Sequence, residues 1–244
     1  MMVSSTEVQN RFGKYLQLAV QEEIIITRNG VPVAKLCSLE KQATSAGIFP
    51  GIVTEEAPSP DYGGKKATYQ QFLSLTKDSE IRCEYIDGEI HMLASPKIEH
   101  QLALMELFVI FRDWFQGKPC TPVIAPFDIT LKRPDGQINV VQPDIMVICD
   151  LEEKLQNGYY TGVPTLIIEV ISESTARIDL IKKLDLYMSC GVEEYWIANP
   201  QNKEIIVHSF KEQQLAGYTT YKSPEKAVSQ VFPGLCAELA RVFK

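Results

Sequence analysis

Two apolar stretches, Gln142-Pro143-Asp144-Ile145-Met146-Val147-Ile148 and Thr165-Leu166-Ile167-Ile168-Glu169-Val170-Ile171, decide the fold, and each contains one acidic residue. Short apolar runs rich in β-branched residues predict buried strands. A carboxylate inside a buried strand costs several kcal/mol unless it is paired, protonated or bound to a metal. Asp144 and Glu169 therefore predict a divalent-metal site between neighbouring strands.

A lysine is the expected third member of this site. Lys183 follows on a predicted helix with Lys182 beside it, and Tyr187 lies one turn further along the same face. Each residue also has a structural alternative. An Asp after a Pro is, taken alone, more often a turn or cap residue, and paired lysines are often a solvated helix face. Glu169 has the fewest structural explanations, because isolated buried carboxylates are rare.

Two carboxylates and a lysine fit the chemistry of phosphodiester hydrolysis. Mg²⁺ prefers hard oxygen ligands and commonly uses one or two carboxylates together with substrate phosphate oxygens. Such an ion lowers the pKa of a bound water and stabilises charge on a phosphoryl oxygen. We therefore expect Mg²⁺ as the cofactor, with Mn²⁺ as a possible substitute, held by Asp144 and Glu169 while Lys183 orients the attacking water.

The composition is that of a globular protein. The chain has 244 residues, 45% of them hydrophobic, which is enough for one ordinary domain and a small one. Its six cysteines are scattered without a Cys-x-x-Cys pair, which argues against a zinc site or a disulfide framework and favours a reduced cytoplasm. No secretory signal pattern and no apolar run of about 20 residues is present, so no membrane partner is expected.

The net charge of −7 counts against a sequence-independent nucleic-acid binder, because such proteins usually carry a basic surface. DNA would have to be bound by local basic patches or through a metal ion. The charge is unevenly shared, since residues 1–41 hold five Lys/Arg against four Asp/Glu. The N-terminal part thus differs in character from the remainder.

The first 41 residues predict a small separate unit. Ser4-x-x-Glu7 is a capping-box pattern, and Val8, Phe12, Leu16 and Ala19 recur behind it at helical spacing. This predicts a helix over 5–20, followed by strands over 23–27 and 31–36 around a tight turn. Such a unit is too small to bury its own apolar face, so a homodimer is expected.

This stretch resembles the N-terminal module of Phd/YefM-type antitoxins. The resemblance rests on Val3-Ser4-x-x-Glu7, on Asn10-Arg11-Phe12-Gly13-Lys14-Tyr15-Leu16, and on Ile26 to Leu36, with Asn29-Gly30-Val31-Pro32-Val33-Ala34 at its centre. It implies a dimer that binds operator DNA, with Arg11, Lys14 and Arg28 as candidate phosphate contacts. Solvated surface charges are the alternative reading of these three residues. A toxin partner is a further implication, although the place of the toxin-wrapping segment is taken here by a linker and a second domain.

Residues 42–66, rich in Gly, Pro and Ser, predict a flexible linker, and 67–244 a second domain. Helices are expected over 68–76, from Ser95-Pro96 to about Gly117, and over 174–189. The middle helix is expected to bury Ile98, Leu102, Met105 and Val109. A hairpin over 81–93, closed by Asp87-Gly88, and strands over 123–131, 140–148, 165–171 and 193–198 complete a mixed α/β sheet.

Residues from about 80 to 200 resemble the Uma family of restriction-endonuclease-like proteins, a branch of the PD-(D/E)xK nuclease fold. The matching pieces are Glu84-Tyr85-Ile86-Asp87-Gly88-Glu89-Ile90, Ser95-Pro96, His100-Gln101, Pro143-Asp144-Ile145, Pro164 to Ser172, Asp179, Lys183-Leu184-x-x-Tyr187 and Gly191-Val192-x-Glu194-Tyr195-Trp196.

This resemblance implies a metal-dependent endonuclease acting on DNA. The general fold places its lysine two residues after the acid, where this chain has Ile171, and the Uma pattern maps the lysine to Lys183. Glu84 matches a further acidic position, as a catalytic or supporting group. His100 and Tyr187 are possible substrate contacts. For Glu84 and His100, a structural role is the alternative.

The leading hypothesis is thus a Mg²⁺-dependent DNA endonuclease with an antitoxin-like module for dimerisation and DNA binding. The alternative is an antitoxin-like DNA-binding regulator whose nuclease-fold domain is catalytically idle.

Overall fold

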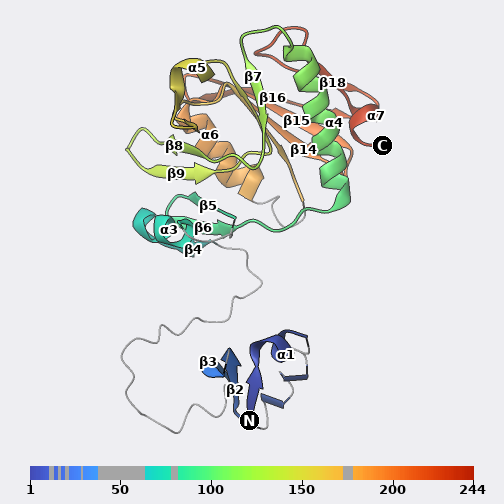
Figure 1. The fold of residues 1–244 in the computed structure, drawn as a ribbon. Coiled ribbons are helices and arrows are strands. Elements are labelled where there is room, and N and C mark those ends of the chain that lie inside the picture. The colour runs from blue at the N-terminus through green and yellow to red at the C-terminus, as the bar shows by residue number, and fades with distance from the viewer. Residues whose placement is uncertain are drawn as a thin grey trace. The chain divides into compact units, whose positions relative to one another are not determined.

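The chain divides into two compact units, Met1–Pro58 and Ser59–Lys244, in a computed structural model (Figure 1). The residues that the structure describes are 1–10, 14–15, 18–19, 22–28, 30–37, 64–77, 82–172 and 178–244. Most of the expected linker, 42–66, lies outside these ranges. Its last two residues, Lys65 and Lys66, form a strand of the second unit.

The described part of the first unit contains a three-stranded sheet and helical segments. Its elements are β1 (Met2–Ser4), α1 (Ser5–Asn10), β2 (Ile24–Arg28) and β3 (Val31–Leu36). β1 pairs with β2 in parallel, and β2 pairs with β3 in an antiparallel hairpin. The hairpin confirms the prediction, whereas β1 was not predicted because three residues are too few for a periodic signal.

The capping signal and part of the expected helical face are confirmed. The hydroxyl of Ser4 accepts a hydrogen bond from the backbone N–H of Glu7 at 3.2 Å. Helical backbone continues at 14–15 and 18–19, and Val8, Tyr15 and Ala19 are buried. The two other predicted core residues of this helix, Phe12 and Leu16, lie outside the described residues.

The described residues of the second unit form two large sheets, two two-stranded sheets and the remaining helices. Its elements in chain order are β4 (Lys65–Lys66), α3 (Tyr69–Thr76), β5 (Cys83–Ile86), β6 (Glu89–Met92), α4 (Ile98–Phe115), β7 (Thr121–Ile124), β8 (Ile129–Lys132), β9 (Ile138–Val141), β10 (Ile145–Ile148), α5 (Leu151–Lys154), β11 (Leu155–Gln156), β12 (Tyr159–Tyr160), β13 (Leu166–Val170), the π-helical turn η2 (Ile178–Lys183), α6 (Leu184–Cys190), β14 (Glu194–Asn199), β15 (Glu204–Lys211), β16 (Gln214–Lys222), β17 (Lys226–Val228), β18 (Cys236–Glu238) and α7 (Leu239–Val242).

A mixed six-stranded sheet in the order β16-β15-β14-β13-β10-β7 forms the centre of this unit. β13 and β14 run in parallel, and the other pairs are antiparallel. Alternate residues of its strands enter two separate cores. One core contains α4 and α7, and the other contains α6 with β8 and β9, so the sheet is covered on both faces (Figure 1). The mixed α/β fold class is confirmed.

The second sheet has the order β4-β6-β5-β9-β8. Its β5–β6 hairpin turns at Asp87-Gly88 as predicted, with Gly88 at φ +80°, where glycine has no steric penalty. Helix α3 packs beside it and begins at Thr68, whose side chain forms a capping box with Gln71. Phe72 of α3 stacks on Tyr85 of β5 at 5.3 Å between ring centroids.

Two predicted strands are each two strands in the structure. Residues 123–131 divide into β7 and β8, which belong to different sheets and flank the cis peptide Ala125-Pro126. Residues 140–148 divide into the ends of β9 and β10 around Gln142-Pro143-Asp144. Proline lacks the N–H that a central ladder needs, and in both places the chain leaves one sheet and enters the other.

The face of α4 that we expected to be buried is exposed. Ile98, Leu102 and Met105 have exposed fractions of 65%, 49% and 53%. The opposite face is the buried one, and its residues are Ala103, Leu104, Leu107, Phe111 and Phe115. The helix is apolar on both faces, so helical spacing alone was compatible with burial of either face. In the structure, the face with Phe111 and Phe115 packs on the sheet.

The cysteine prediction is wrong for one pair, because Cys120 and Cys149 form a disulfide with an S–S distance of 2.06 Å. Residue 120 directly precedes β7, and residue 149 directly follows β10, its antiparallel neighbour. Their separation of 29 residues gave no sequence signal. Among the described helices, none combines the length and apolar character needed to span a membrane.

Candidate active site

Asp144 and Glu169 face each other across two antiparallel strands. β10 pairs with β13 so that Ile145 lies opposite Ile168, and one further step in this register brings Asp144 opposite Glu169. Asp144 Oδ2 accepts a hydrogen bond from the backbone N–H of Val170 at 2.8 Å. The backbone N–H of Asp144 lies 3.4 Å from Glu169 Oε2. The two acids are thus fixed by the ladder itself.

Lys183 and Tyr187 reach Glu169 from the helical segment that follows β13. Glu169 shares a sheet face with Ile167 and Ile171, which is the face covered by α6. Lys183 Nζ and the Tyr187 hydroxyl both donate to Glu169 Oε1, at 2.8 and 2.7 Å. A π-helical turn ends at Lys183, and such turns often occur at functional sites.

Glu84 completes the cluster from the other sheet. Its Oε1 lies 2.9 Å from Lys183 Nζ and also accepts the backbone N–H of Gln142 at 2.9 Å. Exposed fractions of 2% for Glu84 and 4% for both Glu169 and Lys183 show that all three charges are buried. A cation between two buried carboxylates offsets part of their desolvation cost.

The exposed side of the cluster is formed by Asp144 and His100. His100, in the first turn of α4, places Nε2 3.2 Å from Asp144 Oδ2, and these side chains are 13% and 18% exposed. Tyr187 has no exposed surface. This burial favours a role for Tyr187 in orienting Glu169 over the substrate contact that the sequence suggested.

The cluster unites residues from five separate regions, one of which is the start of α4 with His100. Asp144 precedes β10, Glu169 lies on β13, Lys183 ends η2 and Glu84 lies on β5. The six predicted residues of this domain, which include His100 and Tyr187, are joined by the bonds described above. Whether they catalyse a reaction stays a prediction.

The donor set fits a hard divalent cation. Asp144 Oδ1 makes no hydrogen bond to a described residue, and Glu169 Oε2 lies 3.4 Å from the backbone N–H of Asp144. Among the described residues no three acidic, His or Cys side chains converge as a complete ligand set. Mg²⁺ is commonly held by two carboxylates, and water or phosphate oxygens fill its remaining coordination positions.

The candidate phosphate contacts of the first unit have separate positions. Lys14 is exposed, with its Nζ 5.5 Å from the centre of the Tyr15 ring, and Arg28 is exposed at the end of β2. Arg11 lies outside the described residues. The positions of Lys14 and Arg28 are compatible with contact to a ligand and equally with solvated charges.

Sequence reasoning missed His91, the cross-strand partner of Glu84. Its side chain is buried, and neither ring nitrogen has a hydrogen-bond partner among the described residues, although Nε2 lies 3.7 Å from Glu89 Oε2. Burial, followed by the charge of Lys182, lowers the pKa of His91 below its usual value. The alternation Glu89-Ile90-His91 could have placed Glu89 and His91 on one face of the hairpin, but nothing in the sequence showed that this face is covered.

Arg133, also missed, links the hairpin to α6. Its guanidinium makes two hydrogen bonds to Asp87, at 2.8 and 2.9 Å, and further contacts to Asp185 at 2.8 Å and the Ser189 hydroxyl at 2.7 Å. These contacts raise the pKa of Arg133 despite the opposing effect of burial. Arg133 thus joins the two elements that carry Glu84 and Lys183. We expected only a loop around Arg133-Pro134-Asp135-Gly136.

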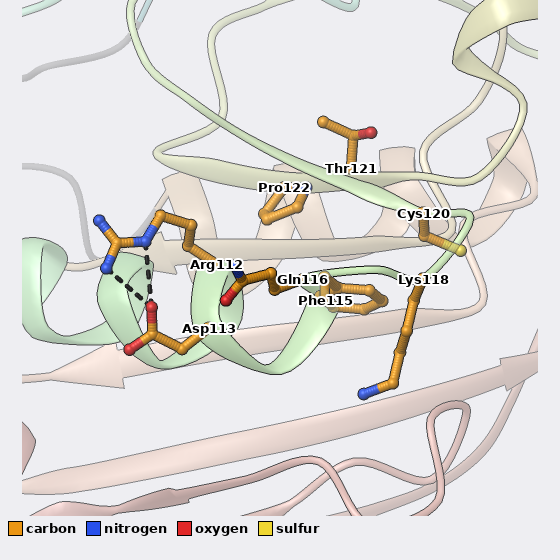
Figure 2. Close-up of a pocket in the computed structure, with 8 residues that line it drawn as sticks. All are labelled: Arg112, Asp113, Phe115, Gln116, Lys118, Cys120, Thr121 and Pro122. Carbon is orange, nitrogen blue, oxygen red and sulfur yellow. Dashed lines mark hydrogen bonds and ion pairs between the residues drawn. The ribbon is translucent and has the colours of Figure 1, made fainter.

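The most evident pocket lies elsewhere, at the C-terminal end of α4 (Figure 2). It is lined by Arg112, Asp113, Phe115, Gln116, Lys118, Cys120, Thr121 and Pro122. His100 is in the first turn of the same helix, so 15 residues of α-helix, about 22 Å, separate it from Phe115. In Figure 2, Arg112 is paired with Asp113 at 2.7 Å and is not directed at a common centre with the other polar groups. The pocket and the acidic cluster are therefore distinct features.

Comparisons with known proteins give matches for both units. The model of the Phd_YefM antitoxin family, of the type II toxin-antitoxin system, matches residues 1–43. A search of curated proteins found no match. Among solved structures, the crystal structure of a putative nuclease belonging to DUF820 from Anabaena variabilis ATCC 29413 superposes with a TM-score of 0.58 at 17% sequence identity. The superposition covers 71% of this chain and 96% of that chain, and at this identity it shows a shared fold.

The family model named Uma2, described as "Putative restriction endonuclease", matches residues 69–240. This range contains both large sheets of the second unit except β4, and all six predicted residues of the cluster. The match covers well over half of the chain, and the protein therefore belongs to the Uma2 family.

Proposed function

We propose that the protein is a divalent-metal-dependent endonuclease that hydrolyses phosphodiester bonds of DNA. The observation that carries this proposal is the position of Lys183 Nζ, 2.8 Å from Glu169 and 2.9 Å from Glu84, with Asp144 opposite Glu169. A lysine beside two buried acids, with a third and partly exposed acid opposite one of them, suits metal-assisted attack of water on phosphorus. Membership of the Uma2 family supports the same reaction.

In this proposal Asp144 and Glu169 hold Mg²⁺, for which Mn²⁺ can substitute. The ion would supply an activated water and neutralise charge on the phosphoryl group. Lys183 donates hydrogen bonds toward the reacting oxygen atoms and stabilises the negative charge that develops there. Glu84 and Tyr187 keep Lys183 and Glu169 in place through the bonds already described.

His100 is the proposed substrate contact of the site. Its side chain is partly exposed beside Asp144, and Nε2 is directed at Oδ2 of that residue. An imidazole in this position can meet a phosphate oxygen that approaches the exposed side of the cluster. In this proposal His100, at the exposed edge, contacts the substrate. The buried residues Glu84 and Tyr187 keep Lys183 and Glu169 in position.

We further propose that the first unit forms a homodimer and contacts DNA phosphates through Arg11, Lys14 and Arg28. β3 leaves Val31 and Val33 62% and 57% exposed, which is apolar surface that a second copy could cover. The match to an antitoxin family supports DNA binding and a toxin as a possible partner. Cytoplasmic location is part of this proposal.

Cleavage of plasmid and linear DNA by the purified full-length chain, with Mg²⁺, with Mn²⁺ and with EDTA, tests the nuclease proposal. The Asp144→Asn and Glu169→Gln variants should lose cleavage and also metal binding measured by calorimetry. Glu152→Gln, an exposed acid on α5, is the matched control and should keep both. Absence of cleavage by the parent with either metal, or undiminished cleavage by Glu169→Gln, would overturn the proposal.

A second candidate function is an antitoxin-like regulator whose nuclease-fold domain is idle. The antitoxin match over residues 1–43 is the observation that favours it. Gel shifts with the DNA upstream of the protein's own gene distinguish the two functions. The regulator predicts specific binding that Lys14→Gln/Arg28→Gln abolishes and Asp144→Asn leaves unchanged, without cleavage of any DNA.

A further inference from the structure

The hairpin that carries Glu84 also places two cations on the same face of its sheet. In the antiparallel ladder Glu84 lies opposite His91, and Glu89 lies opposite Lys66 of β4. Opposite residues share a face, as do alternate residues along a strand. Arg82 lies two residues before Glu84, and its carbonyl accepts the N–H of Leu93 at 3.0 Å, which continues the ladder. Lys66 and Arg82 therefore share the face of Glu84.

Two contacts hold this face against the active-site elements. Arg82 donates from Nε and Nη2 to Gln142 Oε1, at 3.1 and 2.8 Å, and Gln142 is two residues from Asp144. Lys182, adjacent to Lys183, is paired with Glu89. Lys66 and Arg82 are exposed, and the side chain of Lys182 is 35% exposed.

A fourth cation lies at the start of the helix that carries His100. Lys97 directly precedes α4 and is exposed, and His100, three residues later, contacts Asp144. One helical turn spans 3.6 residues, so Lys97 and His100 lie on neighbouring positions of the helix start. Arg82 contacts Gln142, two residues from Asp144, and Lys97 lies three residues before His100, so the two cations are connected to the Asp144–His100 edge through different elements.

The acids of this layer are already paired within the chain. Glu84 pairs with Lys183, Asp87 with Arg133, and Glu89 with Lys182. Lys66, Arg82 and Lys97 are exposed cations on or next to the elements that carry these acids and His100.

We infer that Lys66, Arg82, Lys97 and Lys182 form a phosphate rim, a surface that binds the backbone of DNA on both sides of the bond to be cut. This inference rests on the proposed nuclease function and names the residues that hold its substrate. A local positive rim explains how an acidic protein meets a polyanion, because the repulsive charge lies outside the contact surface.

The test measures binding without catalysis. The full-length chain in EDTA is titrated onto a fluorescent random-sequence DNA duplex at several KCl concentrations, and log K is plotted against log[KCl]. Each phosphate contact contributes about −0.9 to the slope. Lys66→Gln and Arg82→Gln should each make the slope less steep by about 0.9 and weaken binding several-fold. In the double variant the change in slope should be about twice as large.

Three controls make the result specific. Lys211→Gln changes an exposed lysine of β15 and should keep the parent's slope. Arg82→Lys keeps the charge and should restore most of the slope lost in Arg82→Gln, which separates charge from loss of the Gln142 contact. Repeating the series in an Arg11→Gln/Lys14→Gln/Arg28→Gln background removes the three proposed contacts of the first unit.

The outcomes separate the two proposals. Unchanged slope and affinity in the Lys66→Gln/Arg82→Gln double variant overturn the rim, even when the parent cuts DNA. Reduced slopes in a chain that cuts no DNA under any metal condition retain the rim and overturn the nuclease proposal. Equal losses in Lys211→Gln would also count against the rim, because they would show a general charge effect.

Discussion

At the scale of single residues, Lys183 is the one cation shared by two buried carboxylates among the described residues. We expect Lys183→Gln to lose cleavage and to lower the free energy of unfolding by about 3–5 kcal/mol, since breaking a buried ion pair leaves a buried charge uncompensated. Urea unfolding and plasmid cleavage measure the two effects. The neighbouring Lys182→Gln should change stability by less than about 1 kcal/mol, because partly exposed pairs contribute little.

A Lys183→Gln variant that unfolds at the parent's urea midpoint would contradict this assignment, because it would show that Lys183 does not offset the desolvation cost of Glu84 and Glu169.

Tyr187 tests orientation separately from charge. Tyr187→Phe removes the hydroxyl that donates to Glu169 Oε1 at 2.7 Å and keeps the ring that packs on Tyr195. We expect a loss of about 1 kcal/mol in stability and a clear loss of cleavage rate at saturating DNA. Tyr160→Phe is the matched control, because its hydroxyl donates to Asp150 at 2.6 Å outside the cluster. It should lose similar stability and keep the parent's cleavage rate, and an equal loss of rate in both variants would argue against orientation by Tyr187.

The residues of the cluster could be proposed from sequence because each stands in a strong local pattern. Asp144 and Glu169 border or interrupt apolar strands, and Lys183 follows on the next helix. Their mutual distances could not be predicted from these patterns, since Glu84 comes from the second sheet and depends on how the hairpin meets η2. His91 and Arg133 were missed for the same reason, because their partners are distant in sequence.

At the scale of elements, α4 shows the limit of periodicity. Its two apolar faces are both compatible with helical spacing, and only the sheet beneath distinguishes them. The split of residues 123–131 and 140–148 has a similar origin, since a proline shows an interruption but not that the chain changes sheets. The strands β15 and β16 were not predicted. β16 is largely exposed, so its sequence shows only a weak alternation of apolar and polar residues.

The phase of α4 can be tested by one substitution on each face. Leu104 is 6% exposed, whereas Leu102, two residues earlier, is 49% exposed. We expect Leu104→Ala to cost about 2–5 kcal/mol of unfolding free energy, because it leaves a cavity against the sheet. Leu102→Ala should cost less than about 0.5 kcal/mol. Urea unfolding of both variants decides between the faces, and a larger loss for Leu102→Ala would support the phase expected from sequence or show that this face is covered by a partner.

At the scale of the whole molecule, two buried histidines should make the second unit sensitive to mild acid. Burial lowers the pKa of both His91 and His208 below the usual value of 6.5. As the pH falls through about 6.5, the unfolded chain binds protons that the folded chain does not, so the free energy of unfolding must fall. The slope is at most about 1.4 kcal/mol per pH unit for each histidine, and it ends once the pH passes the lower, folded pKa.

His208→Phe removes the contribution of His208 to this pH dependence of the free energy of unfolding. The His208 ring lies between Tyr195 and Tyr218, at 6.1 and 5.8 Å between centroids, and phenylalanine retains such packing without titrating. Urea midpoints measured from about pH 8 to about pH 5.5 should fall for the parent and fall less steeply for the variant, because only His91 continues to contribute. The lower limit keeps most carboxylates ionised. Parallel curves for parent and variant would assign the acid sensitivity to other groups, and a parent whose stability rises toward pH 5.5 would contradict the neutral, buried state of both imidazoles.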